Sequence, residues 1–138
     1  MKFSLMTLGV LVVALIASPA YAQFSSGARP VWDVPFDFIV GDETLPAGQY
    51  TIQRGVTPGA VLVYSLDGKT SHFRLSNAIY GKVADHSVLV FNRHGNQHFL
   101  SRVWIAGRED GSALAKSKLE REMARHGGSG DAVAMVAR

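Results

Sequence analysis

The sequence predicts an all-β domain: a small antiparallel barrel-like meander or sandwich of about six strands with one C-terminal helix. Apolar and polar residues alternate with a period of two over much of residues 31–106. Glycine, proline and aspartate interrupt this alternation at short, regular intervals. No connection is long enough to make consecutive strands parallel. Because each connection is short enough to join neighbours in space, we favour the barrel-like meander.

The first strand is expected over residues 31–40. Its apolar residues share one parity: Trp32, Val34, Phe36, Phe38 and Val40. Asp33, Pro35, Asp37 and Ile39 point the other way, so the strand has one buried face. Pro35 cannot donate a ladder hydrogen bond, which predicts an edge strand or a bulge at this position.

Five further strands are expected after turns, over residues 49–54, 60–66, 69–80, 87–93 and 98–106. In the second strand, Tyr50 and Ile52 point inward. The dipeptide Asp67-Gly68 is typical of a two-residue type I′ hairpin. In the strand over 69–80, Phe73, Leu75 and Ile79 share one face, and the polar His72, Arg74 and Ser76 share the other.

A helix is expected from about Ala113 or Ser117 to about His126. Residues 107–111 are expected to end the sheet. Ser117 and Glu120 have the spacing of a capping box, in which the hydroxyl and the carboxylate each accept a free backbone amide. Leu119 and Met123 give the helix a thin apolar stripe. The glycine-rich run that follows predicts a flexible tail over residues 127–138.

Residues 1–22 have the pattern of a signal peptide, with cleavage expected before Gln23. Lys2 precedes an apolar run over residues 8–17, and Ala20-Tyr21-Ala22 has the small-x-small form of a cleavage site. The run is shorter than the ~20 residues of a membrane-spanning helix. We therefore expect export to the periplasm or the extracellular space. Residues 23–30 are expected to form a flexible arm, and residues 31–126 the domain.

The chain has no cysteine. It therefore has no disulfide, no thiolate zinc site and no lipid anchor at Gln23, where a bacterial lipoprotein needs cysteine. After cleavage, 13 Lys and Arg stand against 11 Asp and Glu. These bases are scattered, except in residues 116–125, where Glu120 and Glu122 offset them. We expect no nucleic-acid partner.

Four histidines raise the question of a metal site: His72, His86, His94 and His98. If Gly95-Asn96 is a two-residue loop, His94 and His98 point to opposite faces of the hairpin. A three-residue loop over 95–97 would place both on one face. Even then the site has two ligands, whereas catalytic zinc usually has three from the protein. We expect exposed polar residues at a hairpin tip and no metal or other cofactor.

No catalytic residues are predicted. Asp33 and Asp37 would lie ~13 Å apart along a strand, too far for a glycosidase carboxyl pair, and solvent exposure is favoured for both. No serine lies in a Gly-x-Ser-x-Gly turn, and no phosphate-binding glycine loop is present.

Eight aromatic residues are a large apolar supply for so small a domain, and most are expected in the core. They are Trp32, Phe36, Phe38, Tyr50, Phe73, Phe91, Phe99 and Trp104. An incompletely filled interior could hold an apolar ligand, and an outer aromatic patch could dock a partner.

Four segments resemble a family of small secreted bacterial proteins of uncharacterised function that is common in soil bacteria. They are residues 34–38 (VPFDF), 45–50 (LPAGQY), 95–100 (GNQHFL) and 117–122 (SKLERE). The resemblance covers nearly the whole mature chain except the tail after Arg125. It implies an exported protein and no catalytic or ligand residue.

The first functional hypothesis is an exported, non-catalytic binding or structural module of the cell envelope or extracellular space. Its partner, an envelope or extracellular protein or a small hydrophobic ligand, would contact a sheet face or the loop over residues 41–48. The second is a β-barrel carrier of a small hydrophobic molecule. The third and least favoured is a secreted hydrolase that uses His86 or His94 with an acidic partner.

Overall fold

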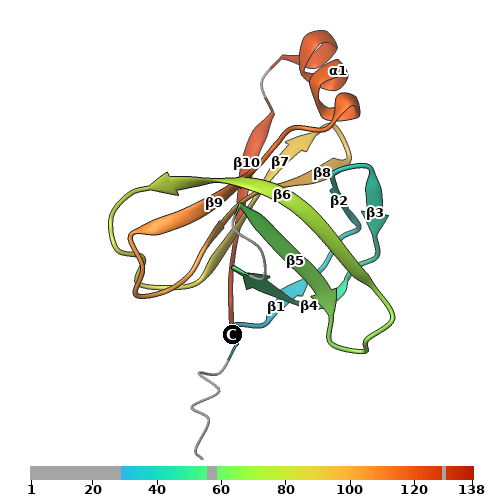
Figure 1. Cartoon of the computed structure of the whole chain (residues 1–138). Helices are drawn as coiled ribbons and strands as arrows, with labels where there is room; N and C mark the ends of the chain where they lie inside the picture. The colour runs from blue at the N-terminus through green and yellow to red at the C-terminus, as the bar shows by residue number, and fades with distance from the viewer. Residues whose placement is uncertain (1–28, 56–58, 129) are drawn as a thin grey trace, which may run out of the picture.

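The computed structural model describes residues 29–55, 59–128 and 130–138. Its ten strands and one helix confirm the all-β class with a C-terminal helix, although about six strands were expected (Figure 1). The elements are β1 Trp32–Val34, β2 Phe38–Val40, β3 Glu43–Leu45, β4 Gly48–Arg54, β5 Ala60–Ser65, β6 Ser71–Tyr80, β7 Val88–His94, β8 Gln97–Trp104, β9 Asp110–Leu114, α1 Lys118–Gly127 and β10 Asp131–Val136.

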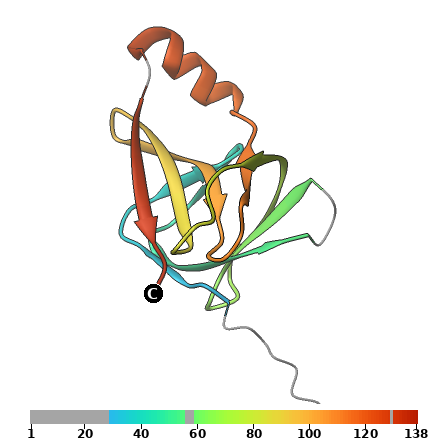
Figure 2. The same ribbon diagram turned by 90° about the vertical axis from the view of Figure 1, so that its left-hand side faces the viewer.

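The strands form one strongly curved sheet that does not close into a barrel. Its order is β1-β4-β5-β6-β9-β8-β2-β3, and β7 and β10 extend it from β8. Several neighbours are far apart in sequence, so the sheet is not the simple meander that was expected. The C-terminus lies beside the start of β1 (Figures 1 and 2). There Arg138 donates its backbone N–H to the Val31 carbonyl at 3.0 Å and pairs with Asp33 at 2.9 Å.

The expected first strand is broken into β1 and β2 at Pro35, in agreement with the absence of a donor there. Of its predicted buried face, Trp32, Val34, Phe38 and Val40 are buried, and Phe36 is half-buried. Ile39, expected on the other face, is buried as well, so β2 is buried on both faces. β1 pairs with β4, and β2 pairs with β3 and also with β8. The β2–β8 pairing, at Ile39 and Phe99, is parallel and corrects the all-antiparallel expectation.

The core is built from aromatic and β-branched side chains on the inner face. Edge-to-face contacts join Phe38 to Tyr50 and to Phe91, with ring centroids 4.9 and 5.4 Å apart. Phe36 lies edge-on to Phe91 as well. These rings fill the centre of the shell, so most of the aromatic supply is used in packing.

β6 has the polar side of its alternation turned toward the core. His72 is opposite Val63 and Arg74 is opposite Val61, and both valines are buried. Phe73 and Leu75 face outward and are 49% and 66% exposed. The expectation that the aromatic residues lie mostly in the core is therefore wrong for Phe73.

The two hairpins differ in how well the sequence predicts them. Gly95 and Asn96 form a two-residue loop, since His94 is the partner of Gln97. The loop between β5 and β6 is longer, and Gly68 is its only described residue with positive φ. A type I′ turn needs positive φ at Asp67 too, so that prediction is wrong.

The chain continues the sheet where two endings were expected. β9 pairs with both β6 and β8, although residues 107–111 were expected to end the sheet. β10 pairs with β7 over its own whole length, from Asp131 opposite Arg93 to Val136 opposite Val88. The expected flexible tail over residues 127–138 is therefore a strand between Asp131 and Val136.

α1 begins one residue after Ser117, whose hydroxyl accepts the backbone N–H of Glu120 at 3.1 Å. This confirms one half of the predicted capping box. The other half is absent among the described residues, because the Glu120 carboxylate accepts the side-chain amide of Asn92, in β7, at 2.9 Å. Glu120 therefore fixes the helix to the outer face of the sheet.

The predicted signal peptide, and the arm as far as residue 28, lie outside the described residues. Among the described residues, no helix has both the length and the apolar character needed to cross a membrane.

Candidate functional site

A hollow of about 470 Å³ opens at one end of the curved sheet, beside the ends of β4 and β9. Small residues leave this space, because they reach only a short way from the strands: Gly59, Ala60, Ser76 and Ala78. Pro30, Ile52 and Ile105 add larger apolar walls. The volume lies within the ~300–1,000 Å³ typical of pockets for small molecules.

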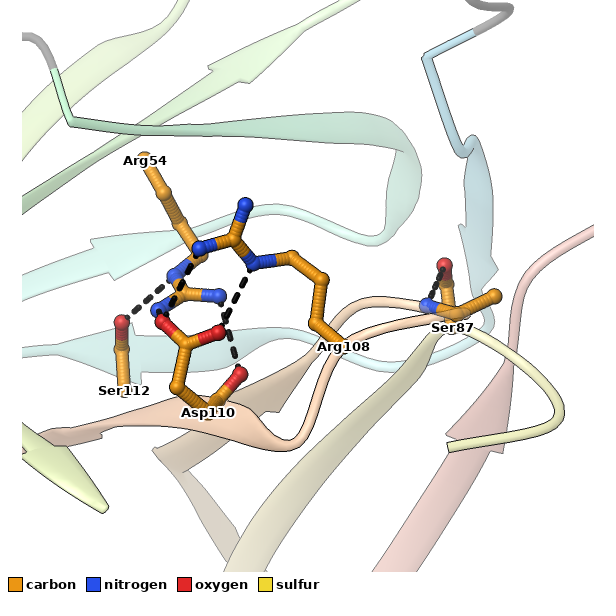
Figure 3. Close-up of polar contacts among 6 residues, drawn as sticks. Arg54, Ser87, Arg108, Asp110 and Ser112 are labelled. Atoms are coloured by element: carbon orange, nitrogen blue, oxygen red, sulfur yellow. Dashed lines mark hydrogen bonds and ion pairs between the residues drawn. The ribbon is translucent and has the colours of Figure 1, made fainter. Parts of the chain in front are cut away.

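The polar side of the hollow is a cluster of Arg54, Arg108, Asp110 and Ser112 (Figure 3). Arg54 ends β4 on the inner face, two residues after Ile52, and reaches across to β9. Its guanidinium donates to the Ser112 hydroxyl at 2.8 Å, to the Asp110 carbonyl at 3.1 Å and to the Asp110 carboxylate at 2.8 Å. These bonds fix Arg54 across the mouth of the hollow, with its side chain 18% exposed.

Arg108, in the connection between β8 and β9, holds the same carboxylate from the other side. It donates to the two Asp110 oxygens at 2.8 and 3.2 Å. Hydrogen bonds from Arg108 and Arg54 lower the pKa of Asp110 from its usual 3.8 to about 2. One carboxylate thus lies between two guanidinium groups, and the cluster carries a net charge of +1.

The cluster predicts a specific acid sensitivity. Because the pKa of Asp110 is lower in the folded than in the unfolded chain, its ion pairs stabilise the fold above pH 3.8. This contribution is lost as the pH falls from 3.8 toward 2. We expect Asp110→Asn to be less stable than wild type at pH 6 and to lose less stability over that acid range. Urea unfolding at each pH measures both effects.

Glu109→Gln is the matched control, because Glu109 adjoins the cluster and makes no ion pair among the described residues. Its profile should follow that of the wild type. If Asp110→Asn keeps the full wild-type acid slope, the carboxylate does not have the proposed linkage.

The histidines do not come together. His86 is exposed before β7, and His72 lies half-buried on the inner face of β6. The two-residue loop places His94 and His98 on opposite faces of the hairpin. His98 stacks on Phe36 with ring centroids 3.8 Å apart, and burial followed by the Arg93 charge lowers its pKa. In the described part of the chain, no three His, Asp or Glu side chains are grouped to hold a metal ion.

His94 does approach an acidic residue, which sequence spacing could not show. Its Nε2 lies 3.6 Å from the Glu120 carboxylate, and both side chains are buried under α1. In the described residues no hydroxyl is hydrogen-bonded to the His94 ring, whose acidic neighbour also accepts the Asn92 amide. The group Asn92, His94 and Glu120 therefore joins α1 to β7.

Asp33 and Asp37 are both exposed and lie apart, since the strand breaks between them. Asp33 pairs with Arg138, and Asp37 accepts the backbone N–H of Ala47 at 2.9 Å. The loop over residues 41–48 contains β3 and begins at Gly41, whose φ is +63°. An added Cβ there would lie 2.9 Å from the Arg74 guanidinium, so this loop rests against β6.

No protein-family model matches the chain, and neither a curated protein nor a solved structure matches it. The resemblance to a family of small secreted bacterial proteins therefore stays a prediction.

Proposed function

We propose that this chain is an exported, non-catalytic binding module of the cell envelope or extracellular space, and that it binds a small molecule in the hollow beside Arg54 and Asp110. The observation that carries the proposal is the hollow itself: about 470 Å³, walled by short apolar side chains and edged by a fixed polar cluster. A few positioned polar groups on an apolar wall are typical of small-molecule sites.

The packed centre of the shell places the proposed site elsewhere than in a barrel carrier. A carrier with a deep apolar interior needs an empty centre, whereas Phe38 and Phe91 pack against each other there. The open end offers room without disturbing this packing. A ligand would therefore bind at the mouth of the shell, with part of its surface in contact with water.

Export is supported by the pattern of residues 1–22. The resemblance to small secreted bacterial proteins agrees with it. Cell fractionation followed by N-terminal sequencing tests this part of the proposal. We expect the protein outside the inner membrane with Gln23 as its first residue. A cytoplasmic protein that keeps residues 1–22 would contradict it.

Native mass spectrometry of the mature chain, purified from the organism that encodes it, tests binding. We expect a retained small molecule in the wild type and its loss in Ala78→Trp, because the indole would fill the hollow. Ala134→Trp is the matched control: Ala134 is an exposed residue of β10, and this variant should retain the molecule. Equal retention by both variants would place the ligand elsewhere, and an empty wild type would contradict a ligand-binding role.

A further inference from the structure

We infer that the hollow selects a small organic anion, such as a carboxylate with a short aliphatic chain. This inference rests on the proposed function, since it names the class of ligand that the hollow would take. The juxtaposition that supports it is the Arg54–Asp110–Arg108 group, drawn in Figure 3, in a hollow that apolar side chains also line.

The polar cluster beside the hollow carries more positive than negative charge. Arg54 and Arg108 contribute two positive charges to the cluster, and Asp110 contributes one negative charge. Arg29 also borders the hollow. Its guanidinium donates to the hydroxyl of Tyr64, a residue that follows the core-facing Val63 and belongs to the outer face of β5. A hydrogen bond to a hydroxyl leaves the Arg29 charge in place, so the excess positive charge beside the apolar wall favours an anion and disfavours a cation.

Arg54 and Arg108 keep hydrogen-bond donors that the cluster does not use. A guanidinium has five N–H groups. Among the described residues, Arg54 uses three of its five and Arg108 uses two. The Ser112 hydroxyl accepts from Arg54 and donates to no described residue. The cluster therefore keeps unused N–H donors beside the hollow, as do sites that bind carboxylates.

Asp110 is not available to bind a cation. Both of its carboxylate oxygens already accept guanidinium hydrogen bonds at 2.8–3.2 Å. Those bonds also hold Arg108, whose side chain is 58% exposed, in a fixed position at the rim. A guanidinium fixed before binding loses less conformational entropy when it contacts a ligand.

The hollow also has an apolar wall. Ile52, Ala78 and Ile105 line the same hollow as the cluster, so a ligand that contacts Arg108 can place a hydrocarbon chain against them. Burial of that chain adds affinity. An inorganic anion would leave this wall in contact with water. The combination therefore favours an anion with an apolar part.

An NMR titration of the mature chain with hexanoate, hexan-1-ol and hexylammonium tests the inference. These probes share the same alkyl chain and differ in the charge of the head group. We expect hexanoate to shift the backbone amides of Ile52, Ala78 and Ser112 and to bind at least tenfold more tightly than hexan-1-ol. Raising the salt concentration should weaken hexanoate binding and leave hexan-1-ol binding unchanged.

Arg108→Gln should bring hexanoate affinity down to that of hexan-1-ol, whose own affinity stays the same and shows that the hollow is intact. Arg121→Gln removes an exposed arginine of α1 and should leave all three affinities unchanged. Equal or tighter binding of hexan-1-ol by the wild type would overturn the anion inference while keeping the hollow as a ligand site. A preference for hexylammonium, or no shift of these amides with any probe, would also overturn it, and mass spectrometry of the native protein would remain the separate measure of the proposed function.

Discussion

Phe91→Ala is expected to destabilise the fold by about 3–5 kcal/mol, as for other buried Phe→Ala changes. Phe91 is fully buried in β7 and contacts Phe36 and Phe38 edge-on, with ring centroids 5.2 and 5.4 Å away. Its removal leaves a cavity that rigid strands on either side cannot close. The expected result is a large fall in the urea midpoint, or failure to fold at 37 °C, measured by circular dichroism.

Phe73→Ala is the matched control, because it removes the same side chain from a position that is 49% exposed. We expect a cost of under about 1 kcal/mol, the value of one cross-strand pair, since Phe73 is opposite Leu62. Similar losses for the two variants would contradict the orientation of β6 described above. The pair of variants therefore distinguishes a buried polar face of β6 from a buried apolar one.

Gly130→Ala has the second largest expected effect, about 1–3 kcal/mol. Gly130 lies directly before β10, and an added Cβ would be 2.5 Å from the Arg93 carbonyl oxygen and 2.8 Å from the His94 ring. Because one of these atoms belongs to the backbone, the start of β10 must move away from β7. Hydrogen exchange should speed up at residues 131–136, and the urea midpoint should fall.

Gly127→Ala is the control for this change. Gly127 is the last residue of α1, and no heavy atom lies within 4 Å of its added Cβ. Stability should change by less than about 0.5 kcal/mol. If Gly130→Ala exchanges as slowly as wild type over residues 131–136, the packing of this strand against β7 is not as tight as described.

The sequence predicts the strands whose two faces differ, misses β10, whose faces are alike, and finds β6 without its inner face. Trp32, Val34, Phe38 and Val40 share one parity with aspartates on the other, and all four are buried as expected. β10 was missed because a glycine-rich run precedes it. Its alternation of Val133 and Met135 with alanines is a period-two signal, but it is weak because both sides are apolar.

β6 shows why alternation alone cannot fix an orientation. Its apolar residues share one face, yet the inner face is chosen by the partner strand, where Val61 and Val63 lie opposite Arg74 and His72. The pairing has the register of a hairpin centred on Asp67-Gly68, with Tyr64 opposite Ser71, so this signal places the hairpin correctly even though the turn is not type I′. The inner face of β6 follows from this register and from which residues of β5 are buried. A shift of one residue in register exchanges the two faces of a strand.

The candidate site could not be found from local spacing. Arg54 and Asp110 are 56 positions apart and meet only because β4 and β9 border the same open end of the sheet. The sequence predicts that the sheet ends over residues 107–111, and this prediction gives Arg108 and Asp110 no functional role. Their Arg-x-Asp spacing lets one guanidinium bind a carboxylate two residues away, and this local signal is common in loops.

The contact between Arg138 and Val31 affects the order in which the molecule can assemble. The two ends of the domain are more than 100 residues apart in sequence, and contacts of such separation form slowly. A chain that crosses a membrane with its N-terminus first cannot complete its last strand pairing until its final residues have emerged. Under the proposed export, this late pairing would delay folding on the side of synthesis and keep the polypeptide threadable for longer.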